Sequence, residues 1–302
     1  MAVEKSHVKC CWCQEPLSRD SDVPLWRWWM CWTPACLKKI CEWNIAKCQV
    51  DAKGKVKRDP KTKQPMVESF EFVPIPRQVD FAEQTRKTKH TLYGGHKAST
   101  KSYMLRWMAY RDCARIAGLR VLLLRRTFGE LEETHLLDMP EDAERLAFVG
   151  ADYLSGKREF WMANKSLVKA GHCETRADVS KFLSTQWDRI IFDEVITFLL
   201  DEMFLPIISC ARSSKPQVIA EGGAQVWAGT NPGGRGARWV KEWFLDREVD
   251  LERYPKYNSA QWGYVPGYLD DNPYTEPGYR DTLENLPPVL RAQWLHGDWD
   301  AF

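Results

Sequence analysis

The sequence has no long hydrophobic run, no strong excess of one charge, no internal repeat and no low-complexity tract. A transmembrane helix needs about 20 consecutive apolar residues, and no segment approaches that length. The stretch from Met1 to Cys13 contains no apolar core typical of a signal peptide. We therefore expect neither a membrane protein nor a secreted one. With 43 Lys and Arg against 41 Asp and Glu, only local patches can indicate an anionic partner.

Cysteine and tryptophan are concentrated at one end of the chain. Seven of the ten cysteines and six of the 15 tryptophans lie in the first 48 residues. Without a secretion signal, clustered cysteines favour metal ligands or free thiols over disulfides. The pairs Cys10 with Cys13 and Cys31 with Cys36 have spacings compatible with a four-thiolate zinc site. The alternatives are a ligand set that includes Cys11, Cys41, Cys48 or His7, and a set of buried thiols packed among tryptophans.

The composition changes twice along the chain. Residues 51–63 carry six basic and two acidic side chains and almost nothing apolar, which predicts a linker or a loop. We therefore divide the 302 residues into a Cys/Trp-rich segment 1–50, a basic linker 51–66 and an α/β domain 67–302. Within the domain, apolar strands at 90–93, 120–124, 189–192 and 226–230 alternate with helical patterns such as 102–117 and 237–246. This alternation predicts a mostly parallel sheet flanked by helices. Residues 254–279, rich in Tyr, Pro and Gly, are predicted to form surface loops.

A glycine-rich segment, GGHKASTKS at 94–102, follows the first strand and precedes a helix. The phosphate-loop template is Gly, four residues, Gly, Lys, then Ser or Thr; here Thr100 stands at the second glycine. Because a β-branched residue resists positive φ, we expect a slightly different or strained loop there. Alone, the segment fits a nucleotide loop or a basic turn entering a helix. Its candidate nucleotide-binding residues are Gly94, Gly95, His96, Lys97, Ala98, Ser99, Thr100, Lys101 and Ser102.

Two further strands end in polar residues. Asp193 and Glu194 follow RIIF, and Thr230 and Asn231 end VWAGTN. In a parallel sheet the carboxyl ends of the strands form the ligand-binding edge. A P-loop ATPase would use Asp193 for Mg²⁺ and Glu194 to polarise the attacking water, while Thr230 and Asn231 would sense the γ-phosphate. The alternatives are two solvated carboxylates and a simple strand-to-helix turn.

The order GGHKASTKS, VLLLRRTFGELEE, FDE and TNPGG resembles the ATPase domain of tailed-bacteriophage terminase large subunits, the DNA-packaging motors. The resemblance covers about residues 70 to 302, and the end, WLHGDWDAF, resembles the junction to that family's nuclease domain. It implies a P-loop NTPase fold of the ASCE type that hydrolyses ATP with Mg²⁺ and translocates double-stranded DNA into a procapsid. It also implies a portal protein and a terminase small subunit as partners, a homo-oligomeric ring, and the cytoplasm of the host cell. We expect no nuclease activity from this chain.

Carried over residue by residue, the resemblance implies the following site. PRQVDF resembles the adenine-reading segment, with Gln78 in the glutamine position. The loop has His96 and Lys97 where the family often has an arginine finger. Arg125 and Arg126 are therefore either the alternative fingers or strand-end charges that meet acidic groups, and Arg126 is taken as a nucleotide contact. The implied catalytic set is Glu194, Lys101, Thr230 and Asn231, and the implied magnesium ligands are Ser102 and Asp193.

Two other functions stay open at this stage. One is another DNA-dependent P-loop ATPase of the helicase-like type. The other is a zinc-stapled DNA-binding or scaffold protein whose nucleotide site has decayed. The threonine at position 100 favours a decayed nucleotide site. The presence of Lys101, Ser102, Asp193 and Glu194 argues against such a decay.

Overall fold

The structure is a computed structural model that describes residues 45–52, 55–61, 66–72 and 74–301. The chain divides into two compact units, Met1–Val79 and Asp80–Phe302. In the first unit, β1 (Ala46–Cys48) pairs antiparallel with β2 (Val67–Phe70). An isolated bridge joins Val50, the last residue of the expected Cys/Trp-rich segment, to Val56 of the expected linker. The division at residues 50 and 66 stays a prediction.

The second unit is built on an eight-stranded sheet of order β10-β3-β9-β8-β4-β7-β6-β5. The six strands from β10 to β7 run parallel, and β6 and β5 add an antiparallel edge. The mostly parallel α/β sheet expected from the sequence is therefore confirmed. The strands are β3 (His90–Gly95), β4 (Arg120–Arg125), β5 (Asp152–Leu154), β6 (Glu159–Trp161), β7 (Leu167–His172), β8 (Arg189–Asp193), β9 (Gln225–Thr230) and β10 (Trp262–Gly267).

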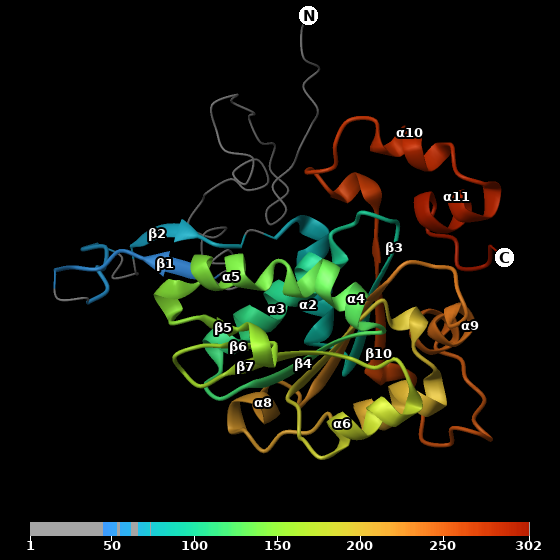
Figure 1. Ribbon diagram of the computed structural model, residues 1–302, viewed down its shortest axis with the longest axis horizontal. Helices are drawn as coiled ribbons and strands as arrows, with labels where there is room; N and C mark the ends of the chain where they lie inside the picture. Colours follow the sequence, from blue (N-terminus) through green and yellow to red (C-terminus); the bar gives the residue numbers. More distant parts are fainter. Residues whose placement is uncertain (1–44, 53–54, 62–65, 73, 302) are drawn as a thin grey trace, which may run out of the picture. The chain divides into compact units, whose positions relative to one another are not determined.

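Helices cover both faces of this sheet. Figure 1 shows α3 and α5 on one side of the strands and α6 and α8 on the other. No helix among the described residues combines the length and the apolar character that a membrane crossing demands. The α-helices are α2 (Pro76–Thr85), α3 (Lys101–Arg115), α4 (Phe128–Leu131), α5 (Met139–Arg145), α6 (Ser180–Leu183), α7 (Leu205–Ile208), α8 (Pro216–Ala220), α9 (Ala237–Val240), α10 (Tyr279–Glu284) and α11 (Pro288–Leu295). Three π-helical segments are η2 (Glu132–Leu136), η7 (Leu200–Phe204) and η8 (Lys241–Asp246).

Large aromatic side chains fill the core on both faces. On one face Phe204, Phe244 and Trp262 pack together, with the Phe244 and Trp262 ring centroids 4.8 Å apart. Elsewhere in the unit, Tyr110 of α3 stacks on Phe160 of β6 at 4.2 Å. Each fully buried side chain of this kind stabilises the fold by about 1.5–3 kcal/mol. The central strands β3, β8 and β9 are buried along their whole length, so their ends are fixed rigidly in space.

The loop prediction for residues 254–279 was wrong at its centre, where β10 forms. β10 runs parallel to β3, with Trp262 opposite His90 and Gly267 opposite Gly95. Trp262 is only 4% exposed. Pairing with β3 satisfies the backbone groups of a segment whose glycines and proline disfavour a strand, because tertiary contacts override weak propensity.

Candidate active site

The loop between β3 and α3 has the concave backbone that a phosphate group needs. Gly95 has φ +130°, and a Cβ there would lie 2.6 Å from the carbonyl oxygen of Gly267, so only glycine fits. Ala98 and Thr100 adopt left-handed backbone with φ of +59° and +63°. Alternating backbone of this kind turns successive N–H groups toward one point, beside the positive end of the α3 dipole. The loop is therefore shaped to hold an anion.

Thr100 has the strained conformation that its sequence position predicts. A β-branched residue with positive φ is a genuine outlier and costs on the order of 1–3 kcal/mol. Its Oγ1 donates a hydrogen bond to the carbonyl of Ser99 at 2.6 Å. The loop thus takes the glycine-type backbone without a glycine at this position.

The first half of the loop is attached to the C-terminal part of the unit. The backbone N–H of His96 donates to the carbonyl of Gly267 at 2.8 Å, and that of Lys97 donates to the carbonyl of Trp294 at 2.8 Å. The Lys97 ammonium lies 4.0 Å from the centre of the Trp294 ring. The His96 ring meets the Tyr268 ring edge-on at 5.1 Å. These contacts fix the loop shape, and they engage His96 and Lys97, two of the predicted nucleotide contacts.

Lys101 joins the loop to the end of β9. Its buried ammonium donates to the His96 carbonyl at 2.7 Å, to Ser99 Oγ at 2.9 Å and to Asn231 Oδ1 at 2.6 Å. Burial lowers the pKa of Lys101 to about 8, against the opposing effect of the Glu194 and Asp193 carboxylates. A strongly desolvated cation of this kind suits an anionic ligand.

Asp193, at the end of β8, uses its two carboxylate oxygens differently. Oδ1 accepts a hydrogen bond from Ser102 Oγ at 3.1 Å. Oδ2 lies 3.0 Å from Nε2 of His135 and 3.0 Å from Nε of Arg125. Burial raises the pKa of Asp193, but His135, Arg125 and Ser102 together lower it to about 2. Asp193 is therefore a permanent carboxylate. Its Oδ2 is held by His135 and Arg125, and its Oδ1 faces Ser102.

His135 was not predicted from the sequence. It lies on η2 with no solvent exposure, and Arg106 of α3 places Nη1 3.5 Å from its Nδ1. Because a guanidinium can only donate, Nδ1 is the acceptor, so Nε2 carries the proton and donates to Asp193. Burial lowers the pKa of His135, which favours this neutral form. His135 and Asp193 are 58 residues apart in the sequence, so no local sequence pattern links them.

Glu194 follows Asp193 in left-handed backbone, with φ +56°. Its Oε2 accepts a hydrogen bond from Oγ1 of the buried Thr230 at 2.8 Å. Burial and the neighbouring Asp193 raise the pKa of Glu194, although Lys101 and Thr230 act in the opposite direction. A carboxylate with a raised pKa suits a general base better than an ordinary one.

Two predicted nucleotide contacts have other partners in the structure. The Arg126 guanidinium donates to the Cys173 carbonyl at 2.5 Å and lies 3.0 Å from the Met203 sulfur. Gln78 belongs to the first unit, and its Oε1 accepts a hydrogen bond from the backbone of Ile75 at 3.0 Å. Their roles toward a nucleotide, and that of Arg125 as a finger, stay predictions. The structure brings Arg125, not Arg126, to the acidic pair.

The oxygen atoms of Ser102 and Asp193 fit Mg²⁺. Mg²⁺ prefers hard oxygen ligands and usually takes only one or two from the protein, the others being water and phosphate. Within the described residues no group of three or more His, Cys, Asp or Glu side chains could hold a metal by itself. The four cysteines of the predicted zinc site, Cys10, Cys13, Cys31 and Cys36, lie outside the described residues, so that site also stays a prediction.

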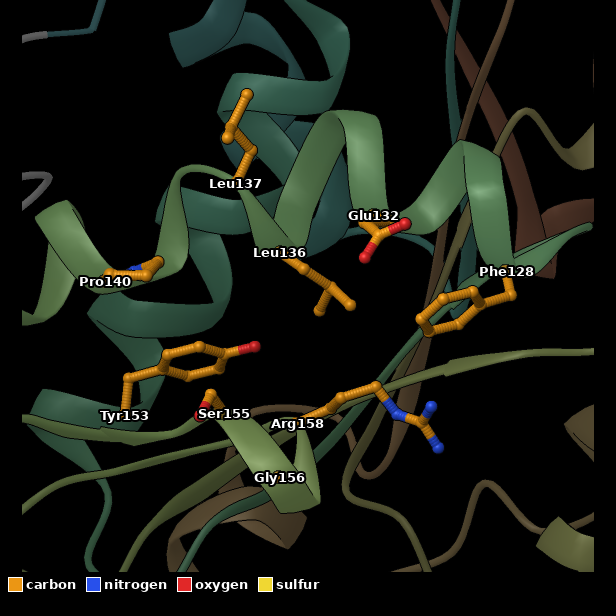
Figure 2. A pocket seen from close by; sticks show the side chains of 9 residues that line it. All are labelled: Phe128, Glu132, Leu136, Leu137, Pro140, Tyr153, Ser155, Gly156 and Arg158. Atoms are coloured by element: carbon orange, nitrogen blue, oxygen red, sulfur yellow. The ribbon is translucent and has the colours of Figure 1, made fainter.

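The π-helical segment that carries His135 has a second, outward side. Figure 2 shows Leu136 of η2 and the Tyr153 hydroxyl directed into a cavity of about 380 Å³. Phe128 and Arg158 border this cavity, with the Arg158 guanidinium 5.6 Å from the centre of the Phe128 ring. Consecutive residues of η2 thus contact the acidic pair and an open apolar cavity.

Comparison with solved structures identifies the fold. The large terminase of a thermophilic bacteriophage matches with a TM-score of 0.57 and 13% identity, over 75% of this chain and 54% of that one. The complex of the same terminase with ATP-gamma-S matches with a TM-score of 0.56. The large terminase ATPase domain of Thermus phage P74-26 matches with a TM-score of 0.53 and 14% identity, over 75% of this chain and 94% of that one.

These matches confirm the fold expected from the sequence motifs. The chain has the α/β fold of phage large-terminase ATPase domains. It spans about half the length of the large terminase from the thermophilic bacteriophage. No protein-family model matches the sequence, and no curated protein matches it.

Proposed function

We propose that this chain hydrolyses ATP to drive double-stranded viral DNA into a procapsid, as the motor part of a terminase large subunit. The observation that carries the proposal is the convergence of Lys101, Ser102, Asp193, Glu194 and Thr230 at one edge of a terminase-type sheet. Neighbours with this fold include one large terminase in complex with ATP-gamma-S and the same terminase in complex with ADP, which supports a nucleotide as the ligand.

Nucleotide binding would use the groups of the loop. The backbone from Ala98 to Lys101 would surround the β-phosphate at the start of α3, and the Lys101 ammonium would exchange its loop acceptors for phosphate oxygens. Ser102 and Asp193 would hold Mg²⁺, which neutralises the charge that develops on the phosphate oxygens.

Hydrolysis would then need a positioned water. Glu194 would accept a proton from this water. At the same time the water oxygen would form a bond to the γ-phosphorus, and the bond between the γ-phosphorus and the bridging β–γ oxygen would break. The raised pKa of Glu194 makes its carboxylate a stronger base, and Asp193 stays ionised beside it. The two adjacent carboxylates thus have environments that separate their roles.

Thr230 and Asn231 would transmit the state of the nucleotide. Thr230 contacts Glu194, and Asn231 contacts Lys101, so one strand end touches both the base and the phosphate-binding lysine. A change in either contact would move the β9 end and the segment that follows it. We propose this strand end as the coupling element of a ring assembled on a portal protein, with a small subunit and DNA as further partners in the host cytoplasm.

The test is translocation on linear double-stranded DNA that carries a bound third strand as a roadblock. A packaging motor displaces the third strand with Mg-ATP and leaves the duplex intact, and Glu194→Gln displaces nothing. Separation of the duplex strands would instead indicate a helicase-like ATPase. DNA binding with no ATP binding would indicate the scaffold function.

A further inference from the structure

A second cavity, with a polar lining, lies at the opposite ends of the strands from the candidate active site, where β4 and β8 begin. It has a volume of about 290 Å³ and is lined by residues from three segments: Arg120; then Ser184, Thr185, Gln186 and Asp188; and then residues 212–215. The catalytic groups follow the carboxyl ends of the same strands. A strand of five residues spans about 17 Å, so the cavity is separate from the nucleotide site.

The backbone of this cavity is preformed. The N–H of Arg120 donates to Oδ2 of the buried Asp188 at 2.8 Å, and the N–H of Asp188 donates to the Arg120 carbonyl at 2.9 Å. The Trp187 N–H donates to the Cys210 carbonyl at 3.0 Å, and the Arg212 N–H donates back to the Trp187 carbonyl at 3.1 Å. The three lining segments are thus hydrogen-bonded to one another before any ligand arrives.

Positive charge exceeds negative charge in the lining. Lys215 is neutralised by Asp188, with Nζ 2.8 Å from Oδ2. The Arg120 guanidinium lies over the Trp187 ring, 5.4 Å from its centre, and in the described part of the chain no carboxylate forms an ion pair with Arg120 or Arg212. Two guanidinium groups therefore remain uncompensated at one preformed cavity.

The remaining lining groups suit a phosphate. Ser184, Ser213 and Ser214 bring hydroxyl groups that can donate to anionic oxygens, and a guanidinium matches a phosphate in bidentate geometry. Among the described residues that line the cavity there is no aromatic ring on which a base could stack, so base recognition is not supported. The cavity in Figure 2 differs, because there Glu132 accompanies the one cation of its lining, Arg158.

From this combination we infer that the cavity at Arg120, Arg212 and Ser213 binds a phosphate group, supplied by the backbone of a nucleic acid. The phosphate chemistry stands on the cavity alone. The choice of DNA as the polymer rests on the proposed function. Free inorganic phosphate offers the same chemistry, and the experiment below separates the two sources.

The experiment uses the full chain and the double variant Arg120→Ala with Arg212→Ala. Binding of a blunt DNA duplex is measured by fluorescence anisotropy from about 50 to about 200 mM NaCl. Each cation that contacts a phosphate contributes about 0.9 to the slope of log K against log salt. The double variant should lower that slope by about 1–2 and weaken binding about tenfold at low salt. Arg120→Lys with Arg212→Lys retains the charges and should retain most of the slope.

The matched control removes two exposed lysines outside the cavity, Lys157→Ala with Lys256→Ala. An equal loss in this control, or an unchanged slope in the arginine double variant, overturns a nucleic-acid site. If the arginine double variant loses binding of inorganic phosphate but binds DNA as the parent does, the cavity is a phosphate site whose ligand is the free anion. Basal ATP hydrolysis should be the same in all variants. Its absence in the parent would contradict the proposed function without affecting the salt slopes.

Discussion

His135 Nε2 lies 3.0 Å from Asp193 Oδ2, and both side chains are fully buried. The contact leaves Asp193 Oδ1 facing Ser102, where Mg²⁺ is expected. The structure therefore orients the carboxylate that we propose as a magnesium ligand through a histidine on a neighbouring π-helical segment, itself held by Arg106. Hydrogen bonds of this kind to a metal ligand are as much part of a site as the ligand.

Replacing His135 should impair magnesium use. For His135→Ala we expect an increase of about 10–100-fold in the Mg²⁺ concentration for half-maximal ATP hydrolysis, because such partners typically contribute that much. His135→Gln keeps an amide that can donate to Asp193 and should recover most of the loss. The measurement is ATPase rate against Mg²⁺ at saturating ATP. Equal Mg²⁺ dependence in the parent and His135→Ala, both folded, would show that the contact is only structural.

Relieving the loop strain should stabilise the protein. Thr100→Gly removes a left-handed β-branched residue, a gain of about 1–3 kcal/mol that the flexibility of glycine reduces by about 0.5–1 kcal/mol. We expect a net gain of about 1 kcal/mol in the free energy of unfolding in denaturant, with ATP binding retained. The opposite change, Gly95→Ala, should destabilise, because its Cβ would meet the Gly267 carbonyl at 2.6 Å. If Thr100→Gly has a lower free energy of unfolding than the parent, the backbone at Thr100 is not strained.

Acid should weaken the fold through His90. Burial against Trp262, with ring centroids 4.1 Å apart, lowers the pKa of His90 to about 3 from 6.5. Below pH 6.5 the unfolded chain takes up a proton that the folded chain does not, so stability falls as pH falls toward 3. The loss is about 1.4 kcal/mol per pH unit, or about 2 kcal/mol between about pH 6.5 and about pH 5.

His90→Phe retains the stacked ring and removes the titration. Its free energy of unfolding should therefore fall less than that of the parent over the same pH range, as measured by denaturant unfolding at each pH. Parallel pH profiles for the two proteins would show that His90 titrates normally in the folded state.

The central strands and the phosphate-loop segment could be predicted from the sequence, because their local sequence patterns favour the same structures that their places in the sheet require. The apolar strands ending at Gly95, Asp193 and Thr230 became β3, β8 and β9, and the segment after Gly95 became the loop and α3. Alternating strands and helices dictate parallel strands, and parallel strands bring their carboxyl ends together. The order of polar residues along the sequence was therefore enough to place them at one edge.

Other features depend on contacts that sequence distance hides. Strand β10 contains Gly263 and Pro266 and forms because β3 offers a partner. His135 approaches Asp193 from a π-helical segment, and the two residues are 58 positions apart in the sequence. Of the two adjacent arginines, Arg125 pairs with Asp193 and Arg126 donates to the Cys173 carbonyl, a difference that their neighbouring positions in the sequence do not predict.

The most direct test of the central claim is steady-state Mg-ATP hydrolysis by this chain beside Glu194→Gln. The account predicts turnover in the parent and a decrease of at least about 100-fold in the variant, because the amide cannot accept the proton from water. ATP should still bind the variant, since Lys101, Ser102 and Asp193 are unchanged. A parent that neither binds nor hydrolyses ATP, or a variant as active as the parent, would contradict the account.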